Sequence, residues 1–420
     1  LVERLKPSLK SIGTYVLMTD REHMPAATQL NGLLCYEGLL AEVSPEIEWP
    51  DFDENAACAL CYTSGTTGEP KGVLYSNRSM VIHSLYVIAA HPHTFAHNRT
   101  ILPVVPLFHA NAWGLPYITP VTGCPLILPG LKLDGPSLFD LMESEGVHSG
   151  CGVPTVWLGL LDEFKKRGRK PRNLVQILSG GSAMPQAMID TFTRDYDIDV
   201  MHGWGMTEMS PVGTLTILRP EERTRPPLER AALTARQGRR VYGVDLKIID
   251  EKGQRAPADG ETSGELFVRG PTIVSGYFNN PEASARQIDA EGWFATGDVA
   301  KITPDGWLVI VDRTKDLVKS GGEWISSIDV ENAALACKGV ANCAVIGVPH
   351  PKWNERPLLV VVKAPGTEPT KAEILDVLGS RIAKWQLPDD VVFVDALPLT
   401  ATGKISKKDL RARFADYKLP

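Results

Sequence analysis

Cysteine is scarce in this sequence, and an excess of positive charge is missing. Seven cysteines at irregular spacings in 420 residues are too few for a disulfide scaffold, which favours a reducing, cytoplasmic setting. Lysine and arginine together number 44 against 50 aspartates and glutamates, and the formal net charge is −6. This mild acidity argues against a general binder of nucleic acid, because such proteins carry a basic face.

Long apolar runs are also missing. In the stretch Ile101–Leu131, prolines such as Pro103 and Pro116 and polar residues such as His109 interrupt every apolar segment. A membrane-spanning helix needs roughly 18–20 consecutive apolar residues, so we expect no transmembrane segment. The hydrophobic fraction of 43% is nevertheless ample for packed cores, and the length suggests two or three domains.

Residues 1–235 alternate short apolar runs with helical patterns. The expected strands are Ala57–Tyr62, Ile101–Val105, Pro125–Leu128 and Val175–Leu178, and the expected helices are Leu138–Glu145, Val156–Lys166 and Ala187–Tyr196. This alternation predicts an α/β domain with a largely parallel sheet. Ala57–Tyr62 stops at a cluster of Ser, Thr and Gly, so we expect it to be a buried parallel strand that runs into a loop.

The pattern changes at about Arg236 and again after Asp312. Residues 236–312 predict an antiparallel β subdomain, with strands at Val244–Asp250, Gly264–Val268 and Trp307–Val311. Residues 313–420 predict a compact α+β domain, with strands at Val340–Val348 and Leu358–Lys363. Three helix-start signatures occur in that last part, at Ser326…Asp329, Thr370…Glu373 and Ser406…Asp409.

A loop suited to phosphate follows the first predicted strand, in Tyr62-Thr-Ser-Gly-Thr-Thr-Gly-Glu-Pro-Lys-Gly-Val73. Its glycines allow close backbone approach, its hydroxyls can donate hydrogen bonds to phosphate oxygens, and its lysine supplies a positive charge. These residues are Gly65, Gly68 and Gly72, then Ser64, Thr66 and Thr67, and finally Lys71. The order Lys-Gly excludes a Walker-type loop, which requires Gly-Lys followed by Ser or Thr.

Tyr62–Val73 resembles the signature loop of the adenylate-forming superfamily, which includes acyl-CoA synthetases, firefly luciferase and peptide-synthetase adenylation domains. Further motifs of that superfamily follow in order, at Pro106–Trp113, His202–Glu208, Gly264–Gly270, Trp293–Asp298, Asp312–Ser326 and Pro398–Lys404. The resemblance covers residues from about 55 to 415. The forms Gly-Gly-Glu-Trp-Ile-Ser and Phe-His-Ala-Asn-Ala-Trp are most similar to medium- and long-chain fatty acyl-CoA synthetases.

The resemblance implies a large N-terminal domain of parallel-rich sheets and helices with a β subdomain, and a small, mobile α+β C-terminal domain. It implies ATP, Mg²⁺ and coenzyme A as cosubstrates and cofactor. A carboxylic acid, expected to be a medium- or long-chain fatty acid, reacts with ATP to give acyl-AMP and pyrophosphate, and the thiol of CoA then displaces AMP. Two alternatives stay open: a ligase for another acid or for a carrier protein, and an AMP-binding fragment with impaired catalysis.

The same resemblance assigns catalytic roles. Thr63 and Glu208 would sit near Mg²⁺, because a carboxylate and a hydroxyl are the hard oxygen ligands that Mg²⁺ prefers. Thr207 would hydrogen-bond the AMP phosphate, and Lys404 would stabilise the charge that develops during adenylation. His109 would orient the acid rather than act as a base, because a carboxylate needs no deprotonation at neutral pH. The alternatives are a helix cap for Glu208 and an exposed surface position for Lys404.

Further residues are implied for nucleotide and CoA binding. Asp298 would bind the ribose hydroxyls and Arg313 the ribose or phosphate, unless Asp298 merely forms a surface turn. The wall of the adenine site would comprise Gly181, Ser182, His202, Gly203 and Trp204. Trp113 would lie between the adenine and acyl pockets, or simply in the core. Lys71 and Lys319 would contact phosphate in different domain orientations, or lie on the surface. Lys315 would mark the pivot of the small C-terminal domain. Glu323 and Trp324 would belong to the face that this domain presents in the second step.

Relatives of this superfamily carry a longer segment before the phosphate loop than this sequence does. We therefore expect the first part of the large domain to be absent, and a homodimer to form where that segment is present. Four histidines, His83, His91, His93 and His97, form a loose group that we do not expect to bind metal. The pair Cys58 and Cys61 is expected to serve core packing rather than metal binding.

Overall fold

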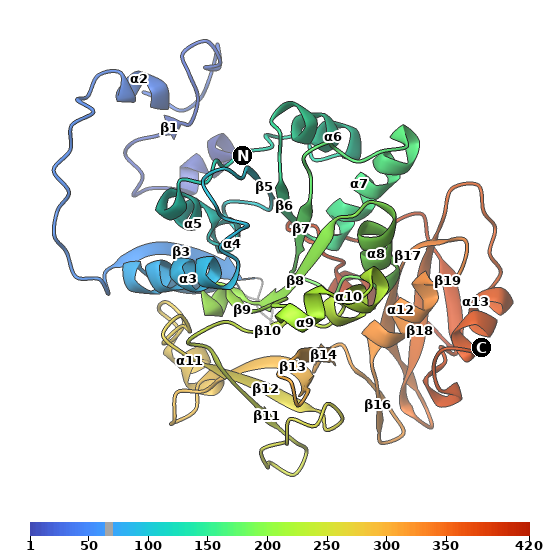
Figure 1. Cartoon of the computed structure of the whole chain (residues 1–420). Helices are drawn as coiled ribbons and strands as arrows, with labels where there is room; N and C mark the ends of the chain where they lie inside the picture. Colours follow the sequence, from blue (N-terminus) through green and yellow to red (C-terminus); the bar gives the residue numbers. More distant parts are fainter. Residues whose placement is uncertain (64–69) are drawn as a thin grey trace. The chain divides into compact units, whose positions relative to one another are not determined.

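The computed structural model describes residues 1–63 and 70–420 of the chain (Figure 1). The predicted phosphate-loop residues Ser64, Gly65, Thr66, Thr67 and Gly68 lie outside the described residues. The chain forms two compact units, Leu1–Asp53 and Glu54–Pro420. Within the described part, no helix has the length and apolar character needed to cross a membrane.

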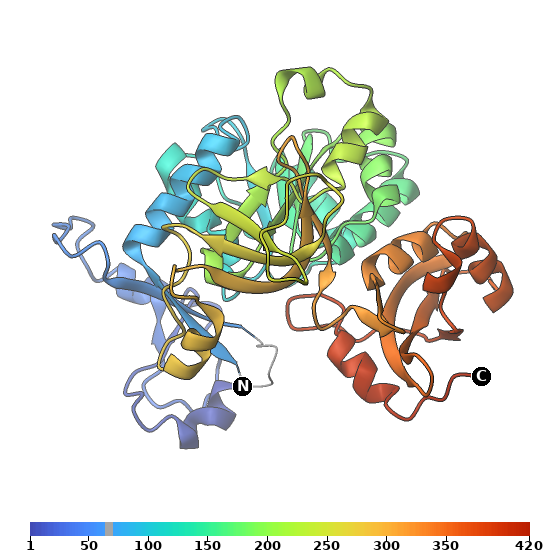
Figure 2. The same ribbon diagram turned by 90° about the horizontal axis from the view of Figure 1, so that it is seen from below.

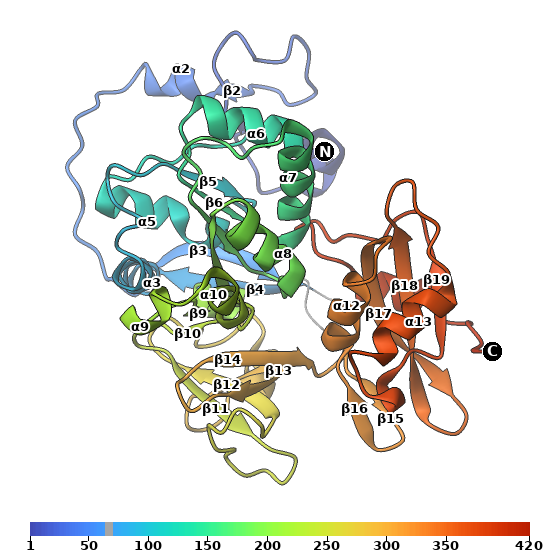
Figure 3. The same cartoon turned by 45° about the vertical axis from the view of Figure 1, so that its right-hand side comes forward.

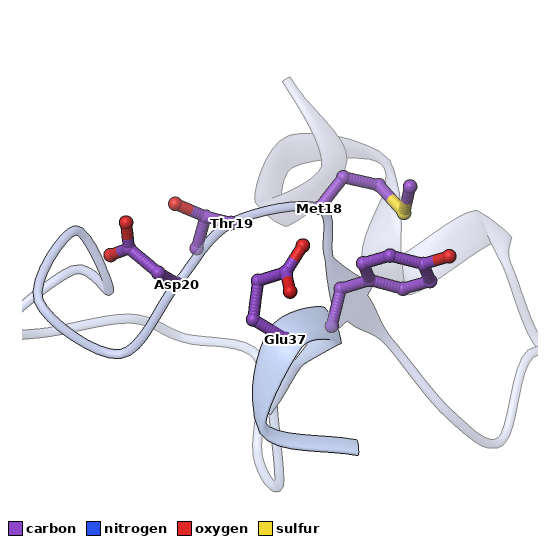
Figure 4. A pocket seen from close by; sticks show the side chains of 5 residues that line it. Met18, Thr19, Asp20 and Glu37 are labelled. Carbon is purple, nitrogen blue, oxygen red and sulfur yellow. The ribbon is translucent and has the colours of Figure 1, made fainter. Parts of the chain in front are cut away.

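The first unit contains little regular structure. Its elements are α1 (Val2–Leu5), the short helix η1 (Lys6–Ser8), β1 (Val16–Leu17), β2 (Leu34–Cys35) and α2 (Tyr36–Leu40). The two strands pair in parallel. Figure 4 shows an open pocket of this unit, which is lined by Met18, Thr19, Asp20, Tyr36 and Glu37. None of the predicted site residues belongs to this unit.

The second unit begins with a hairpin. β3 (Ala57–Thr63) pairs antiparallel with β4 (Lys71–Ser76), and Thr63 lies opposite Lys71. The prediction of a buried parallel strand at Ala57–Tyr62 was therefore wrong: its partner is the segment that follows the loop, and only Cys61 of β3 is fully buried. α3 (Asn77–Ala90) follows, and Ser76 Oγ caps it by accepting a hydrogen bond from the Ser79 N–H.

A six-stranded sheet forms the centre of this unit, in the order β10-β9-β8-β7-β6-β5. Its parallel strands are β5 (Ile101–Val104), β6 (Ser149–Gly152), β7 (Gln176–Ser179) and β8 (Asp199–Gly205). Two antiparallel strands extend it, β9 (Val212–Leu215) and β10 (Arg239–Arg240). The expected strand at Pro125–Leu128 did not form, because only Leu126 makes a single bridge to Ile101.

Helices cover both faces of the sheet because successive side chains on a strand point to opposite sides. One face is covered by α6 (Gly135–Ser144), α7 (Pro154–Arg167) and α8 (Gln186–Asp190) (Figure 3), together with the π-helical turn η2 (Thr191–Asp195). Trp157, Phe139 and Phe164 are fully buried there. α3, α5 (Leu115–Thr122) and the hairpin pack on the other. The remaining elements are α4 (Ala110–Trp113), η3 (Thr207–Met209), α9 (Pro220–Arg223) and α10 (Pro227–Thr234).

The predicted antiparallel β region forms a four-stranded sheet (Figure 2). Its strands are β11 (Asp245–Ile249), β12 (Gly264–Arg269), β13 (Phe294–Ile302) and β14 (Leu308–Arg313), and α11 (Pro281–Gln287) precedes β13. β13 was not predicted, although most of the motif Trp293–Asp298 lies on it. Asp298 of β13 pairs with Arg313 of β14, which places two predicted nucleotide-binding residues side by side.

The C-terminal part is an α+β fold around a five-stranded sheet. Its elements are β15 (Val318–Ser320), β16 (Glu323–Ile325), α12 (Ser327–Leu335), β17 (Val340–His350), β18 (Asn354–Lys363), α13 (Lys371–Gly379), η4 (Lys384–Gln386), β19 (Asp390–Phe393) and α14 (Lys407–Arg413). All three predicted helix starts are confirmed: Ser326, Thr370 and Ser406 each accept a hydrogen bond from the backbone N–H three residues later. The predicted fold class is confirmed.

Candidate active site

The carboxyl ends of the four parallel strands carry most of the predicted chemistry. β5 leads to His109, β6 to Thr155, β7 to Gly181 and β8 to Thr207. Ligands of open α/β sheets bind at this edge, because loops leaving parallel strands at their carboxyl ends gather there. The order of the strands in the sheet therefore brings together motifs that are far apart in the sequence.

Glu208 is held by hydrogen bonds from outside its own segment. Its side chain is 5% exposed, and Oε1 accepts a hydrogen bond of 2.8 Å from Tyr277 Oη. Its carbonyl accepts another from the Val274 N–H at 2.8 Å, and the neighbouring Thr207 carbonyl accepts one from Tyr75 Oη at 2.7 Å. The carboxylate thus faces Tyr277 rather than capping a helix.

Burial raises the pKa of Glu208, while the Tyr277 hydrogen bond and the charges of Arg313 and Lys71 partly oppose that rise. Lys71 Nζ lies 4.8 Å from the centroid of the Tyr277 ring, so these three side chains form one group. β3, which ends at Thr63 opposite Lys71, packs against η3. A buried carboxylate that lacks a full counter-charge suits a divalent cation.

No cluster of three or more His, Cys, Asp or Glu suited to a metal ion occurs among residues 1–63 and 70–420. Mg²⁺ usually binds one or two protein carboxylates and completes its shell with water and phosphate oxygens. Glu208 with the Thr63 hydroxyl fits that mode of binding. Their role at the metal stays a prediction.

Asp298 forms a second group with Trp204 and Arg313. It is 5% exposed; Oδ2 accepts a hydrogen bond of 2.8 Å from Trp204 Nε1, and Oδ1 lies 3.4 Å from Arg313 Nε. Burial raises the pKa of Asp298, and attraction to Arg313 is the largest opposing cause. The carboxylate is therefore not part of an exposed turn, and its geometry suits a partner with hydroxyl donors.

Lys404 reaches this group from the C-terminal part of the chain. A Cβ on Gly181 would lie 2.8 Å from Lys404 Cε and 3.3 Å from Nζ, so the lysine stem crosses a position where only glycine, at φ +80°, leaves room. Thr155 Oγ1 donates a hydrogen bond of 3.0 Å to the Gly403 carbonyl. Lys404 is half-buried here and is not an exposed surface residue.

The pKa of Lys404 is lowered to about 8, first by burial and then by the charge of Arg313, although Asp298 attracts the ammonium. The pKa of His109 is lowered to about 4, by burial and by Lys404. His109 is therefore neutral at pH 7 and can orient a carboxylate by donating an N–H. The orienting role of His109 stays a prediction.

The adenine-wall residues divide into two kinds. His202 is 1% exposed, its Nδ1 lies 3.2 Å from the Thr234 carbonyl, and burial lowers its pKa. Its imidazole therefore belongs to the core rather than to a ligand surface. Ser182 is exposed at the end of β7, and the Gly203 carbonyl would lie 3.3 Å from a Cβ on Gly180, so the two strand ends approach closely here.

Trp113 ends a short left-handed turn. Ala110, Asn111, Ala112 and Trp113 have φ values of 47°, 49°, 48° and 58°. Each L-residue in that conformation costs about 1–2 kcal/mol, so four in succession must be held by their surroundings. The half-buried indole ring packs against the core, and a Cβ on Gly180 would lie 3.4 Å from its Cη2 atom.

The remaining predicted residues lie on the C-terminal part. Burial lowers the pKa of Lys315, which follows β14 and is influenced by the charge of Arg313. Lys319 Nζ lies 5.6 Å from the Trp324 ring centroid, and the Lys319 N–H donates a hydrogen bond to Glu355. The exposed residues Glu323 and Trp324 sit on β16. In this structure the contacts described for Lys319 and Trp324 do not include Glu208, Asp298 or Lys404.

Four residues that form hydrogen bonds in this region were assigned no role from the sequence: Tyr75, Tyr277, Thr155 and Asn111. Tyr277 lies 69 residues after Glu208 and Thr155 lies 248 residues before Gly403, so only the fold brings these pairs together. None of the four lies at a position that its residue type marks as functional. Asn111 gave one usable signal, because Asn tolerates positive φ better than most residues.

Comparison with known proteins identifies the family of this chain. A family model described as AMP-binding enzyme matches residues 4–278, and one described as AMP-binding enzyme C-terminal domain matches residues 329–404. The 3-methylmercaptopropionyl-CoA ligase of Ruegeria lacuscaerulensis is 49% identical over 99% of this chain and 76% of that protein. The medium-chain-fatty-acid–CoA ligase of Ectopseudomonas oleovorans is 45% identical over 100% of this chain and 76% of that protein.

Solved structures show the same likeness. The o-succinylbenzoate coenzyme A synthetase of Bacillus subtilis, solved in complex with ATP and a magnesium ion, superimposes with a TM-score of 0.77. It is 26% identical to this chain, and the match covers 98% of this chain and 82% of that one.

Proposed function

This chain belongs to the family of AMP-binding enzymes and is an acyl-CoA ligase, and from that premise we propose that its acid substrate is an unbranched aliphatic acid of medium chain length. ATP, Mg²⁺ and coenzyme A are the cosubstrates and cofactor expected of AMP-binding CoA ligases. The packing of the Lys404 side chain against Gly181, together with the hydrogen bond from Thr155 to the Gly403 carbonyl, is the observation that carries the proposed residue roles.

In the first half-reaction an oxygen of the acid attacks the α-phosphorus of ATP, the bond to the bridging oxygen breaks, and pyrophosphate leaves. Charge builds on the carboxylate and on the α-phosphate oxygens. The Lys404 ammonium would neutralise part of that charge, and the neutral His109 ring would orient the acid. Asp298 would accept hydrogen bonds from the ribose hydroxyls, with Arg313 beside it.

Mg²⁺ bound at Glu208 and Thr63 would supply charge neutralisation for the triphosphate. Glu208 is preorganised for this role, because Tyr277 fixes one carboxylate oxygen and the backbone of Val274 fixes its main chain. Lys71 lies in the same group and would contact the phosphates. Thr207, whose carbonyl is held by Tyr75, would present its hydroxyl to the AMP phosphate.

In the second half-reaction the CoA sulfur attacks the acyl carbon, the bond to the AMP oxygen breaks, and the thiol proton passes to solvent. We propose that the C-terminal part rotates about Lys315 between the two steps. Lys404 would then leave, and the surface carrying Lys319, Glu323 and Trp324 would replace it. The parts that act in this scheme are 1–235, 236–312 and 313–420, the division proposed from the sequence.

Two relatives support the substrate class by their names, one acting on 3-methylmercaptopropionate and one on medium-chain fatty acids. Both acids are unbranched, and a thioether sulfur replaces one methylene in the first. The segments His109–Pro116 and Trp204–Val212, which contain Trp113 and Glu208 respectively, are mostly apolar and suit an alkyl tail. A thioether acid of similar length is therefore the second candidate.

Pyrophosphate release with a panel of acids tests this proposal. The panel holds pentanoate and 3-methylmercaptopropionate, which have the same number of chain atoms, together with octanoate, palmitate, benzoate and an amino acid. We expect the highest kcat/KM with octanoate, or with 3-methylmercaptopropionate if the second candidate holds, and CoA consumption in step with pyrophosphate. Activity confined to benzoate or the amino acid would contradict the substrate class, and CoA-independent loading of a carrier protein would contradict the acceptor.

A further inference from the structure

A buried aspartate lies just before the proposed pivot Lys315 and is bound by a residue that lies well after it. Asp312, near the end of β14, is 1% exposed and pairs with Val299 of β13. Its Oδ2 accepts hydrogen bonds of 2.6 Å from both the N–H and Oγ of Ser327. Ser327 is the first residue of α12. Asp312 therefore belongs to the four-stranded sheet, and its partner belongs to the part that would rotate.

The residue before Ser327 also bonds across the pivot. Ser326 Oγ donates a hydrogen bond of 2.7 Å to the Val311 carbonyl, while the same oxygen caps α12 by accepting one from the Asp329 N–H at 3.1 Å. α12 packs against β14, which runs toward it (Figure 3). The start of α12 is therefore tied to the end of β14 through both side chains and backbone.

A lysine supports this contact from the other side. Ser327 Oγ accepts a hydrogen bond from Lys407 Nζ, which also lies 2.7 Å from Glu331 Oε1. Burial raises the pKa of Asp312, and the charge of Lys407 is the largest opposing cause. Lys407 is the first residue of α14, the helix that follows the turn of Lys404. A continuous polar network thus connects that turn with β14.

A second aspartate lies just after the pivot and shows the contrast. Asp316 Oδ1 accepts a hydrogen bond of 2.9 Å from Arg411 of α14. Both residues follow Lys315, so rotation about Lys315 would leave this pair intact. The same rotation would move Ser327 relative to Asp312, and hydrogen bonds weaken steeply when they are misaligned. A buried carboxylate that loses its donors is costly, so these contacts favour the orientation in which they form.

We propose that Asp312 is a positioning residue for adenylation. Its hydrogen bonds to Ser327, supported by Lys407, hold the C-terminal part in the orientation in which Lys404 packs against Gly181, and they must break before the thioester step. Asp312 acts through the orientation of the C-terminal part and not by touching a substrate. This inference rests on the proposed function, because it needs the proposed rotation between the two half-reactions.

The first test compares the aspartates on either side of the pivot, with the two half-reactions measured separately. Asp312→Asn keeps the shape of the side chain but removes the charge that binds Ser327, so pyrophosphate release should slow about tenfold. CoA acylation from supplied acyl-AMP should be unchanged or faster, because that step uses the rotated orientation. Equal slowing of both steps would show general destabilisation and overturn the proposal.

Asp316→Asn is the matched control, because it weakens a hydrogen bond of similar length that does not cross the pivot. It should lower the melting temperature about as much as Asp312→Asn does and leave the ratio of the two rates within about twofold of wild type. A change in that ratio as large as the change in Asp312→Asn would remove the distinction between the two sides of the pivot and overturn the proposal.

A further variant separates Asp312 from its neighbour Arg313, whose N–H donates a hydrogen bond of 2.7 Å to Asp312 Oδ1. Ser327→Ala removes a donor to Asp312 and leaves the Arg313 contact in place, so adenylation should fall about threefold to fivefold. KM for ATP should stay within about twofold in both variants. A rise of KM for ATP in Asp312→Asn, with no effect of Ser327→Ala, would mean that Asp312 acts through Arg313 and would overturn the proposal.

The hydrogen bond from Thr155 to the Gly403 carbonyl would favour the same orientation at another point. In a Thr155→Val background that orientation is already less populated, so Asp312→Asn should slow adenylation by at least the factor seen in the wild-type background. An unchanged rate in both backgrounds would overturn the proposal. If wild-type protein releases pyrophosphate with none of the acids, the proposed function fails. If it completes both half-reactions and Asp312→Asn alters them equally, only this inference fails.

Discussion

Glu208 and Lys404 are two charged side chains of one candidate site, and they are held in opposite ways. Glu208 is fixed by neighbours from separate segments, with Tyr277 on its carboxylate and Val274 on its carbonyl. Lys404 lies on a turn closed within Thr400–Lys404, and the hydrogen bond described between that turn and the sheet edge runs from Thr155 to Gly403.

In the proposed mechanism, Glu208 belongs to a part of the site that stays in place, and Lys404 belongs to a part that leaves. Burial changes both pKa values toward the neutral form, upward for Glu208 and downward to about 8 for Lys404. The AMP phosphate stays bound from the first half-reaction to the second, so we expect the segment of Thr207 and Glu208 to keep its place in both. The charge that Lys404 offers is needed while the acyl-AMP bond forms, so a lysine on a detachable turn is sufficient.

The largest expected effect comes from removing the Lys404 side chain. Lys404→Ala removes a preorganised positive charge and should lower acyl-AMP formation by about 10²–10³-fold. Thioester formation from supplied acyl-AMP should stay nearly intact, because the proposed rotation would have withdrawn Lys404 from the site by then. The two half-reactions are measured separately by pyrophosphate release and by CoA acylation.

Lys408→Ala is the matched control for Lys404, since Lys408 is an exposed lysine on the following helix. It should leave both half-reactions unchanged. Equal loss of both steps in Lys404→Ala would indicate misfolding, and loss confined to the second step would mean that the assigned role is reversed.

The next largest effect is expected from removing the charge of Glu208. Glu208→Gln keeps the shape and the Tyr277 contact but removes the charge, so adenylation at saturating Mg²⁺ should fall by roughly 10²-fold. Nucleotide binding without metal, measured by calorimetry, should change little. Glu221→Gln, at an exposed position on α9, serves as control. Unchanged turnover in Glu208→Gln would remove Glu208 from the metal site.

Residues that lie in contiguous motifs could be predicted from the sequence. Contacts between segments that are distant in the sequence could not. Lys404, Glu208 and Asp298 lie in recognisable motifs, and the caps Ser326 and Thr370 follow from local hydrogen bonding within four residues. Local chemistry of this kind needs no knowledge of the tertiary fold.

Ala57–Tyr62 was predicted as a buried parallel strand because its composition is apolar, but composition does not name the partner of a strand. Its partner is Lys71–Ser76, beyond the loop, and the pair is antiparallel. The left-handed turn before Gly114 was missed for a similar reason. Three of its residues, Ala110, Ala112 and Trp113, have no preference for positive φ, so only their surroundings impose it.

A smaller effect is expected in the pH dependence of adenylation, through the titration of Lys404. Lys404 has its pKa lowered to about 8, so its ammonium is present below that pH and lost above it. The kcat/KM for adenylation should therefore fall about tenfold between pH 7 and pH 9, as the protonated fraction falls. Lys404→Arg stays charged over this range, and its residual activity should lack the decline. A decline of the same size in Lys404→Arg would assign the titration to another group.

The smallest effect concerns the attachment of the lysine turn. Thr155→Val keeps the volume of the side chain but removes the hydroxyl that donates to the Gly403 carbonyl at 3.0 Å. A hydrogen bond of this kind is worth about 0.5–1.5 kcal/mol, so adenylation should fall roughly threefold to tenfold as the docked orientation loses population. Thr155→Ser keeps the donor and should retain wild-type rates. CoA acylation from supplied acyl-AMP should be unchanged or faster in Thr155→Val, because in the proposed mechanism that step uses the orientation in which Lys404 has left. A slower second step would mean that Thr155 acts on the substrate site itself rather than on the attachment of the turn.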